Sequence, residues 1–362
     1  MYCKIFVCPE SGVDFLNYPW TCLLCSSTGR FRQWLSMAVA RSVAAALAPR
    51  TSRQYAGAGH IFIMFCMFLE GASFAMPVSD SVLCLYLQWQ SLTVDPKNLK
   101  TKLSAIRYLH ERMGYVWIPP SERFMVHRCM MGLKRLCLTP TKRKLPITPA
   151  LLMRMRLCPD IDWSTPVMVV IWGAMLIAFF CFLRKDNFTV EKADAFNTRK
   201  HLCRGDVVFG RSDMTFTFRH SKTNQFHARV HRTKAVQIPG HLLDPMRAVI
   251  NAFRVCPHAT ASEPAFAVPS RDGGTTPLTH RLFVETLRYC LGKIGVDPSM
   301  FSGHSFRRGG ATFAHRIGVP PLLIKLMGDW SSDAYMAYVE HATPEDLARL
   351  PRALAKAIAA MT

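Results

Sequence analysis

Apolar residues recur at helical spacing over residues 51–138. The segment 98–113, NLKTKLSAIRYLHERM, places Leu103, Ile106 and Leu109 on one face and basic side chains around the other, as an amphipathic helix does. Further helices are predicted over residues 54–76, as one helix or a helix pair, and over residues 81–90 and 121–138. The first half of the chain is therefore predicted to be an α-helical bundle, and its basic faces favour contact with a phosphate backbone.

A long apolar run marks the start of a second domain. Thr165 and Pro166 precede an unbroken apolar stretch over residues 167–183, which predicts a buried core helix ending at Arg184. The stretch is short for a membrane span, which needs about 20 residues. A core helix is therefore favoured over a membrane segment.

After this helix the spacing of apolar residues changes from a helical one to a period of two residues. Residues 206–240 alternate between apolar and polar positions, which predicts strands. The predicted turns are residues 211–213 and 223–225, the helices that follow are residues 241–256 and 279–296, and a Pro-, Gly- and Ser-rich loop is residues 257–277. The predicted fold class is mainly α with a small antiparallel β-sheet, an α+β domain preceded by an α-helical bundle domain.

The stretch over residues 301–341 combines basic, indole and phenol side chains. Gly318 predicts a helix stop, and Pro320 and Pro321 suit the start of the next helix. His304 and Arg307 are three residues apart, so they share one face of the preceding helix. This segment is predicted to hold three short helices.

The charge balance indicates an anionic partner. Lys and Arg number 45 against 24 Asp and Glu, a formal charge of +21, which points to nucleic acid or an anionic membrane surface. Half of the residues are hydrophobic, which argues against disorder. The 13 cysteines are an odd number and several lie in apolar runs, which favours a reducing compartment. With no apparent signal peptide, the chain is expected in the nucleus of a eukaryote or otherwise in the cytoplasm, and not outside the cell.

A zinc site is a weaker alternative near the N-terminus. Cys22 and Cys25 form one CxxC pair, but no second pair at suitable spacing accompanies them. An uncertain leader without defined chemistry is favoured for residues 1–50.

The residues of the 301–341 stretch suit chemistry on a phosphate. The guanidinium of Arg307 can hold a phosphate with its fork of donors, and His304 can donate to the same group. A tyrosine hydroxyl is a weak nucleophile until a neighbour takes its proton. Together these groups would stabilise the charge that develops in phosphoryl transfer.

The order H-x-x-R, G-x-W and then tyrosine resembles the C-terminal signature of the tyrosine recombinase (phage integrase) family. The segments GHSFRRGGATFAHRIGVP and GDWSSDAYMAYV are most similar to those of recombinases from eukaryotic DIRS-like and Crypton-like mobile elements. Trp330 follows Arg307 by 23 residues, as in the family, and Tyr338 follows Trp330 by eight, one fewer than is usual in bacteria and phages. Tyr335 is therefore the alternative nucleophile, although the Val339 that follows Tyr338 favours Tyr338.

The resemblance implies a site-specific recombinase that cleaves and rejoins DNA strands through a 3′-phosphotyrosyl intermediate, with no cofactor and no metal. FLRKDNFTV resembles the mobile-element motif with the first catalytic arginine, and HSKTNQF resembles the β-hairpin that carries the catalytic lysine. The implied catalytic residues are Arg184 and Arg307 on the phosphate oxygens, His304 in proton transfer, Trp330 as donor and packing group, Lys222 as general acid and Tyr338 as nucleophile.

The implied partner is double-stranded DNA, bound by a homo-oligomer that works as a tetramer on two DNA sites, with no membrane involved. Basic residues expected on the DNA backbone are Lys142, Arg143, Lys144, Arg219, Arg229, Arg232 and Lys234. The domain prediction is a leader over residues 1–50, a helical core-binding (DNA-binding) domain over 51–138, a linker over 139–146, the catalytic domain over 147–342 and a C-terminal helical tail over 343–362.

Some alternatives stay open at this point. The tail either docks on a neighbouring protomer or folds back on its own domain. The chain is either active in integration or excision of a mobile element, or it is an inactive DNA-binding protein derived from such an enzyme. A type IB topoisomerase would share the chemistry without joining two sites. A membrane-surface protein, suggested by charge and the apolar helix, is the least favoured.

Overall fold

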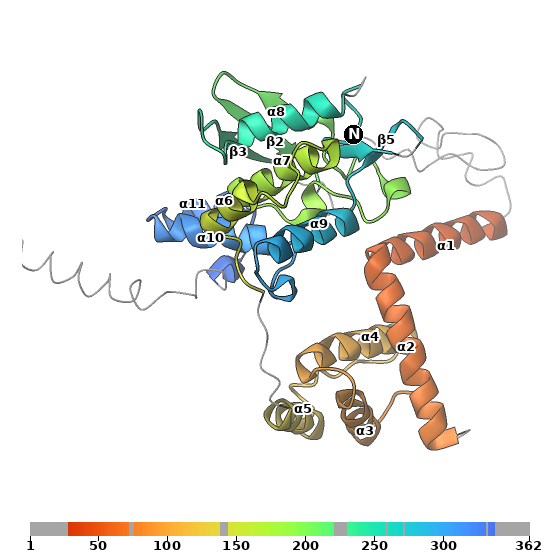
Figure 1. Ribbon diagram of the computed structural model, residues 1–362. Coiled ribbons are helices and arrows are strands. Elements are labelled where there is room, and N and C mark those ends of the chain that lie inside the picture. Colours follow the sequence, from red (N-terminus) through yellow and green to blue (C-terminus); the bar gives the residue numbers. More distant parts are fainter. Residues whose placement is uncertain are drawn as a thin grey trace, which may run out of the picture. The chain divides into compact units, whose positions relative to one another are not determined.

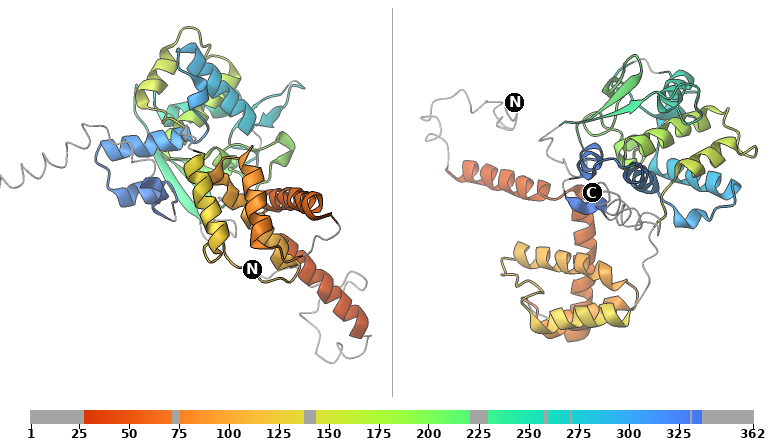
Figure 2. Two further views of the ribbon diagram at one scale, coloured as in Figure 1. Left: turned by 90° about the horizontal axis from the view of Figure 1, so that it is seen from below. Right: turned by 90° about the vertical axis from the view of Figure 1, so that its left-hand side faces the viewer.

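The computed structural model describes residues 28–71, 76–137, 144–220, 230–257, 260–270, 272–330 and 332–336. The chain divides into two compact units, Met1–Thr141 and Lys142–Thr362 (Figures 1 and 2). Each unit has its own apolar core.

The first unit is helical. Its elements are α1 (Thr28–Ala45), α2 (Pro49–Glu70), α3 (Asp80–Ser91), the short 3₁₀ helix η4 (Pro96–Asn98), α4 (Leu99–Arg112) and α5 (Phe124–Leu136). Helix α2 packs on α4, and α3 packs on α5. Phe62, Leu83, Tyr86 and Ile106 are completely buried between them, which confirms the predicted helical bundle.

Several helix boundaries differ from the predicted ones. Helix α2 begins at Pro49, which supplies a fixed backbone angle for the first turn. Helix α5 begins at Phe124, because the chain before it first makes a turn in which Arg123 pairs with Asp80 at 2.6 Å. Helix α1 lies within the region that was predicted only as a leader.

The second unit is built around α7 (Pro166–Phe180), which is buried along nearly its whole length. Its elements in chain order are α6 (Pro149–Leu157), α7, β1 (Val207–Phe209), β2 (Asp213–Phe218), β3 (His231–Val236), α8 (Pro245–Val255), β4 (Ala267–Pro269), β5 (Thr275–Pro277), α9 (His280–Lys293), α10 (Ser305–Arg316), α11 (Pro321–Met327) and the 3₁₀ helix η9 (Asp333–Tyr335). Helices α8 and α10 and strand β4 contact α7 (Figure 1).

The sheet of the second unit is antiparallel, as predicted, with the order β1-β2-β3. Strand β2 buries Met214, Phe216 and Phe218 on one face, which is the period of two read from the sequence. The prediction of a loop over residues 257–277 was wrong in part. Within it, β4 and β5 form a two-stranded antiparallel sheet, because Ala267 and Val268 are buried against the core.

The predicted buried helix is α7, capped by the Thr165 side chain, which accepts from the Met168 N–H at 3.4 Å. It ends at Phe180 and not at Arg184, because Phe182 takes a left-handed backbone with a φ of 50°. No helix among the described residues combines the length and the apolar character that crossing a bilayer requires.

The zinc alternative at Cys22 and Cys25 lies outside the described residues. In the part of the chain that the structure describes, no three His, Cys, Asp or Glu side chains gather as metal ligands.

Candidate active site

The turn after α7 carries the first functional side chains. Phe182 is one of two non-glycine residues with positive φ among those described, and the other is Asp329. Such a backbone costs roughly 1–3 kcal/mol and persists where the surroundings impose it. The Phe182 carbonyl accepts a hydrogen bond from Arg307 Nη1 at 2.6 Å. The strained turn therefore ties the end of α7 to α10.

Arg307 is the most deeply buried cation of this site. It lies in the first turn of α10, and only 2% of it is exposed. Its guanidinium carbon is 3.7 Å from the centroid of the Trp330 ring, a close cation–π contact. Trp330, itself 8% exposed, covers one face of the guanidinium and fixes its plane.

Close approaches of the backbone explain two glycines of the motif. A Cβ at Gly310 would lie 2.2 Å from the Phe179 carbonyl oxygen, so α10 could not pack against the end of α7. A Cβ at Gly328 would lie 1.8 Å from the Trp330 ring. Both glycines therefore help to position Arg307. Gly310 lets α10, which carries Arg307, approach α7, and Gly328 leaves room for the Trp330 ring that packs on the guanidinium.

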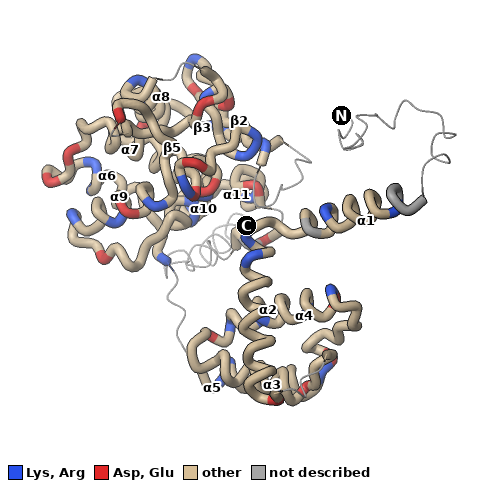
Figure 3. The backbone as a smooth tube through the Cα atoms, turned by 90° about the vertical axis from the view of Figure 1, so that its right-hand side faces the viewer, with Lys and Arg blue, Asp and Glu red and all other residues tan. Residues whose placement is uncertain are grey.

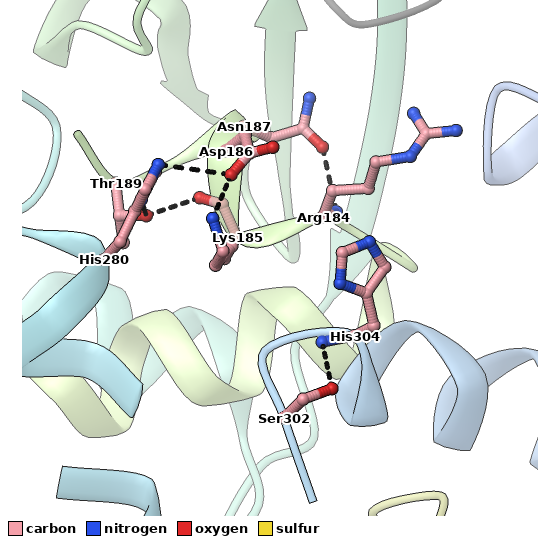
Figure 4. A network of polar contacts seen from close by, with 8 residues as sticks. All are labelled: Arg184, Lys185, Asp186, Asn187, Thr189, His280, Ser302 and His304. Atoms are coloured by element: carbon pink, nitrogen blue, oxygen red, sulfur yellow. Dashed lines mark hydrogen bonds and ion pairs between the residues drawn. The ribbon is translucent and has the colours of Figure 1, made fainter. Parts of the chain in front are cut away.

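Arg184 and His304 lie at the ends of short elements next to Arg307. Arg184 is half-buried and precedes the 3₁₀ helix η5 (Lys185–Asn187). Its backbone N–H donates to Asn187 Oδ1 at 2.9 Å. His304 precedes α10, and its backbone N–H donates to Ser302 Oγ at 3.3 Å. Figure 4 shows the His304 imidazole directed toward Arg184.

The environment lowers the pKa of His304. Desolvation by the surrounding protein atoms is the largest cause, and the charges of Lys185, Arg184 and Arg307 act in the same direction, while Asp186 opposes them. Because the shift favours the neutral imidazole, His304 at neutral pH can accept a proton. Part of its side chain is exposed, so a substrate can reach it.

A polar network supports this side of the site (Figure 4). Asp186 pairs with Lys185 and lies 3.2 Å from His280 Nε2. Thr189 Oγ1 donates to the Lys185 carbonyl at 2.6 Å and lies 2.6 Å from His280 Nδ1. The two ring nitrogens of His280 thus link Thr189 to Asp186. The network holds the segment after Arg184 against α9.

A small hollow opens beside the two arginines. Arg184, Arg307 and Asn187 line it, together with Asp329, which follows α11. The sheet contributes Phe218 and His231. His231 was not among the predicted residues. The only signal in the sequence was its place in the alternating pattern of the third strand.

The structure brings four of the predicted catalytic residues together: Arg184, His304, Arg307 and Trp330. Lys222 and Tyr338 lie outside the described residues, as do Lys142, Arg143 and Arg229 of the predicted DNA contacts. Tyr335, the alternative nucleophile, is 7% exposed, and its ring centroid lies 6.0 Å from that of Trp330. Tyr335 is thus part of the small apolar cluster around Trp330.

The other predicted DNA contacts have neighbours within the chain. Arg219 pairs with the buried carboxylate of Asp206. Lys234 pairs with Asp213 at 2.9 Å, and Lys144 donates to the Ser299 carbonyl at 2.5 Å. Arg232 lies on the exposed face of β3. Whether these side chains also touch DNA stays a prediction.

Comparison with known structures identifies the fold. Neither a protein-family model nor a curated protein matches the sequence. The Tn1549 transposon integrase in complex with transposon right end DNA is similar with a TM-score of 0.56 and 12% identity, over 85% of this chain and 95% of that one. The site-specific recombinase XerH bound to difH substrate is similar with a TM-score of 0.51 and 12% identity, over 78% of this chain and 73% of that one. The chain therefore has the fold of these DNA-bound recombinases.

Proposed function

We propose that this protein is a tyrosine-type site-specific DNA recombinase. The observation that carries the proposal is the setting of Arg307. A guanidinium fixed between the Phe182 carbonyl and the Trp330 ring, with Arg184 beside it in one small hollow, is a rigid anion site. The fold shared with DNA-bound recombinases supports a phosphodiester as that anion.

The proposed reaction exchanges one phosphoester bond for another. The Tyr338 hydroxyl oxygen attacks the phosphorus, a tyrosyl–phosphorus bond forms, and the bond to the 5′ oxygen breaks. Arg184 and Arg307 stabilise the negative charge on the non-bridging oxygens. Neutral His304 takes the phenol proton, and Lys222 gives a proton to the departing 5′ oxygen. A 5′ hydroxyl of another strand then reverses the step, so the ester conserves the bond energy.

Burial argues against Tyr335 as the nucleophile. Tyr335 packs in the cluster with Trp330 and Phe182, so using it would require that cluster to open. Tyr338, three residues further along the chain, carries the motif resemblance and is the proposed nucleophile.

Duplex DNA is the proposed partner of both units. Lys and Arg are spread over the two units (Figure 3), and the net charge of +21 favours a polyanion. By resemblance of its motifs, we propose a recombinase of the DIRS-like or Crypton-like type that acts as a tetramer in integration or excision of a mobile element.

Covalent trapping tests the proposal. Nicked suicide duplexes built from the flanks of the source locus are incubated with the protein in EDTA, and adducts are detected on a denaturing gel. An adduct that resists EDTA is the expected result. Tight DNA binding without any adduct would instead favour an inactive DNA-binding protein, which is the second candidate.

A further inference from the structure

His231 begins β3 and faces the inside of the second unit. In β3 the residues Thr233 and Ala235 are buried, with 5% and 3% exposed, while Arg232 and Lys234 are exposed. Side chains two apart in a strand share a face. His231 therefore lies on the same face as the two buried residues, and it is half-buried.

The neighbouring strand holds the imidazole in place. The β2–β3 register pairs His231 with Phe218, which is 5% exposed. The two rings lie 6.1 Å apart at an angle of 24° between their planes. Because the rings are nearly parallel, the edge of the imidazole with its nitrogens is directed away from the Phe218 face. Both residues line the hollow that contains Arg184 and Arg307.

The charges around the hollow favour an anion. The charged groups that line it are the guanidiniums of Arg184 and Arg307 and the carboxylate of Asp329, and the Cys181 thiol also lies there. Burial raises the pKa of that thiol to about 12, so it is neutral. Two cations against one anion leave the hollow positive before His231 is counted. A phosphate group at the mouth of the hollow has the charge and the acceptor oxygens for these donors.

We propose that His231 is a further catalytic residue, which donates a hydrogen bond to a non-bridging oxygen of the phosphodiester held by Arg184 and Arg307. This role rests on the proposed function. Either the neutral or the protonated imidazole can supply the donor. The bond strengthens as negative charge grows on the phosphate oxygens, so it acts on the transition state more than on bound DNA. In this assignment the sheet adds a donor to those of Arg184 and Arg307.

Substitutions separate this role from simple packing against Phe218. His231→Phe keeps an aromatic ring for the stack and removes the donor, and His231→Gln restores an N–H donor. We expect adduct formation to slow about 10²- to 10³-fold in His231→Phe, as for loss of one oxyanion donor, with partial recovery in His231→Gln. DNA affinity and thermal unfolding should change little. His241→Phe, at an exposed histidine of the same unit, is the matched control and should cleave like the wild type.

A second measurement does not depend on cleavage. The protein is labelled with carbon-13 histidine, and the His231 ring signal, assigned by its loss in His231→Gln, is followed during titration with inorganic phosphate. We expect a saturable shift and a rise in the pKa of His231, because a bound anion favours the imidazolium.

The outcomes separate the two proposals. An absent shift, or wild-type cleavage by His231→Phe, would overturn the role of His231 while leaving the recombinase proposal in place. A saturable shift in a protein that never forms an adduct would refute the recombinase proposal and retain His231 as a phosphate ligand.

Discussion

Arg307→Lys keeps the positive charge of the site but removes the planar fork. The structure gives Arg307 two anchors: the Phe182 carbonyl at 2.6 Å and the Trp330 ring at 3.7 Å from the guanidinium carbon. Leaving a buried acceptor without its donor costs roughly 1–3 kcal/mol, and a desolvated cation–π contact contributes up to about 2 kcal/mol. We therefore expect the free energy of unfolding to fall by about 2–4 kcal/mol, within the 5–15 kcal/mol typical of a folded protein.

Catalysis should fall along with stability. A lysine cannot hold two phosphate oxygens while also reaching the Phe182 carbonyl, so at least one donor to the transition state is lost. We expect adduct formation to slow about 10²- to 10³-fold. The assays are urea denaturation and single-turnover adduct formation on a suicide duplex, with DNA affinity measured in parallel.

Arg316→Lys is the control, because Arg316 lies on the same helix but is exposed. It should leave both quantities close to those of the wild type. Wild-type unfolding and cleavage in Arg307→Lys would refute the role assigned to the buried guanidinium.

Further predictions concern packing, pH and salt. Gly310→Ala should lower the free energy of unfolding by about 1–3 kcal/mol, since its Cβ would meet the Phe179 carbonyl oxygen at 2.2 Å. Gly132→Ala, whose Cβ would meet no atom within 4 Å, should raise the free energy of unfolding by about 0.4–1 kcal/mol. Equal urea midpoints for the two variants would contradict this prediction. His110 is completely buried, and burial lowers its pKa, so the unfolded chain binds its proton at higher pH than the folded chain does. The contribution of His110 to the free energy of unfolding should therefore be complete above pH ~6.5 and should be lost as the pH drops toward its folded pKa. Urea denaturation of His110→Gln should show a smaller loss of stability at low pH than the wild type does. An equal loss in the two proteins would exclude His110 as the cause of the pH dependence. DNA affinity measured by fluorescence anisotropy should fall steeply as salt rises, because phosphate contacts release counterions, and a flat response would argue against a basic DNA interface.

Local chemistry explains which elements could be predicted from the sequence. Thr148 and Thr165 cap α6 and α7 through side-chain hydrogen bonds to the N–H groups of Leu151 and Met168. Pro321 begins α11 after the left-handed Gly318. Each signal involves residues within one helical turn, so no knowledge of the fold was needed to read it.

The features that were missed depend on tertiary packing. Phe182 has no residue-type signal for positive φ, and its backbone follows from the contacts of α7 with α10 and Trp330. His231 looks like one more polar residue in a basic strand until the fold brings it to the hollow that Arg184 and Arg307 line. Strands β4 and β5 have three residues each. Strands this short show no recognisable alternation of apolar and polar residues within a Gly- and Pro-rich segment.

The motif residues could be identified from the sequence, but their contacts could not. The spacing of His304, Arg307 and Trp330 carried the family resemblance, and the structure brings these residues near Arg184. The contact between Arg307 and Trp330 could not be read from a separation of 23 residues. It depends on the turn at Asp329, whose φ is 53°.

The most direct test of the central claim is to locate the covalent bond to DNA. The trapped adduct is digested with nuclease and trypsin, and the peptide that carries the residual nucleotide is sequenced by mass spectrometry. Trypsin releases Tyr335 and Tyr338 in one peptide, residues 326–349, so fragmentation is needed to distinguish them. We predict the nucleotide on Tyr338, joined through its 3′ phosphate, and no adduct in Tyr338→Phe. A nucleotide on any other residue, or an adduct that survives in Tyr338→Phe, would contradict the account.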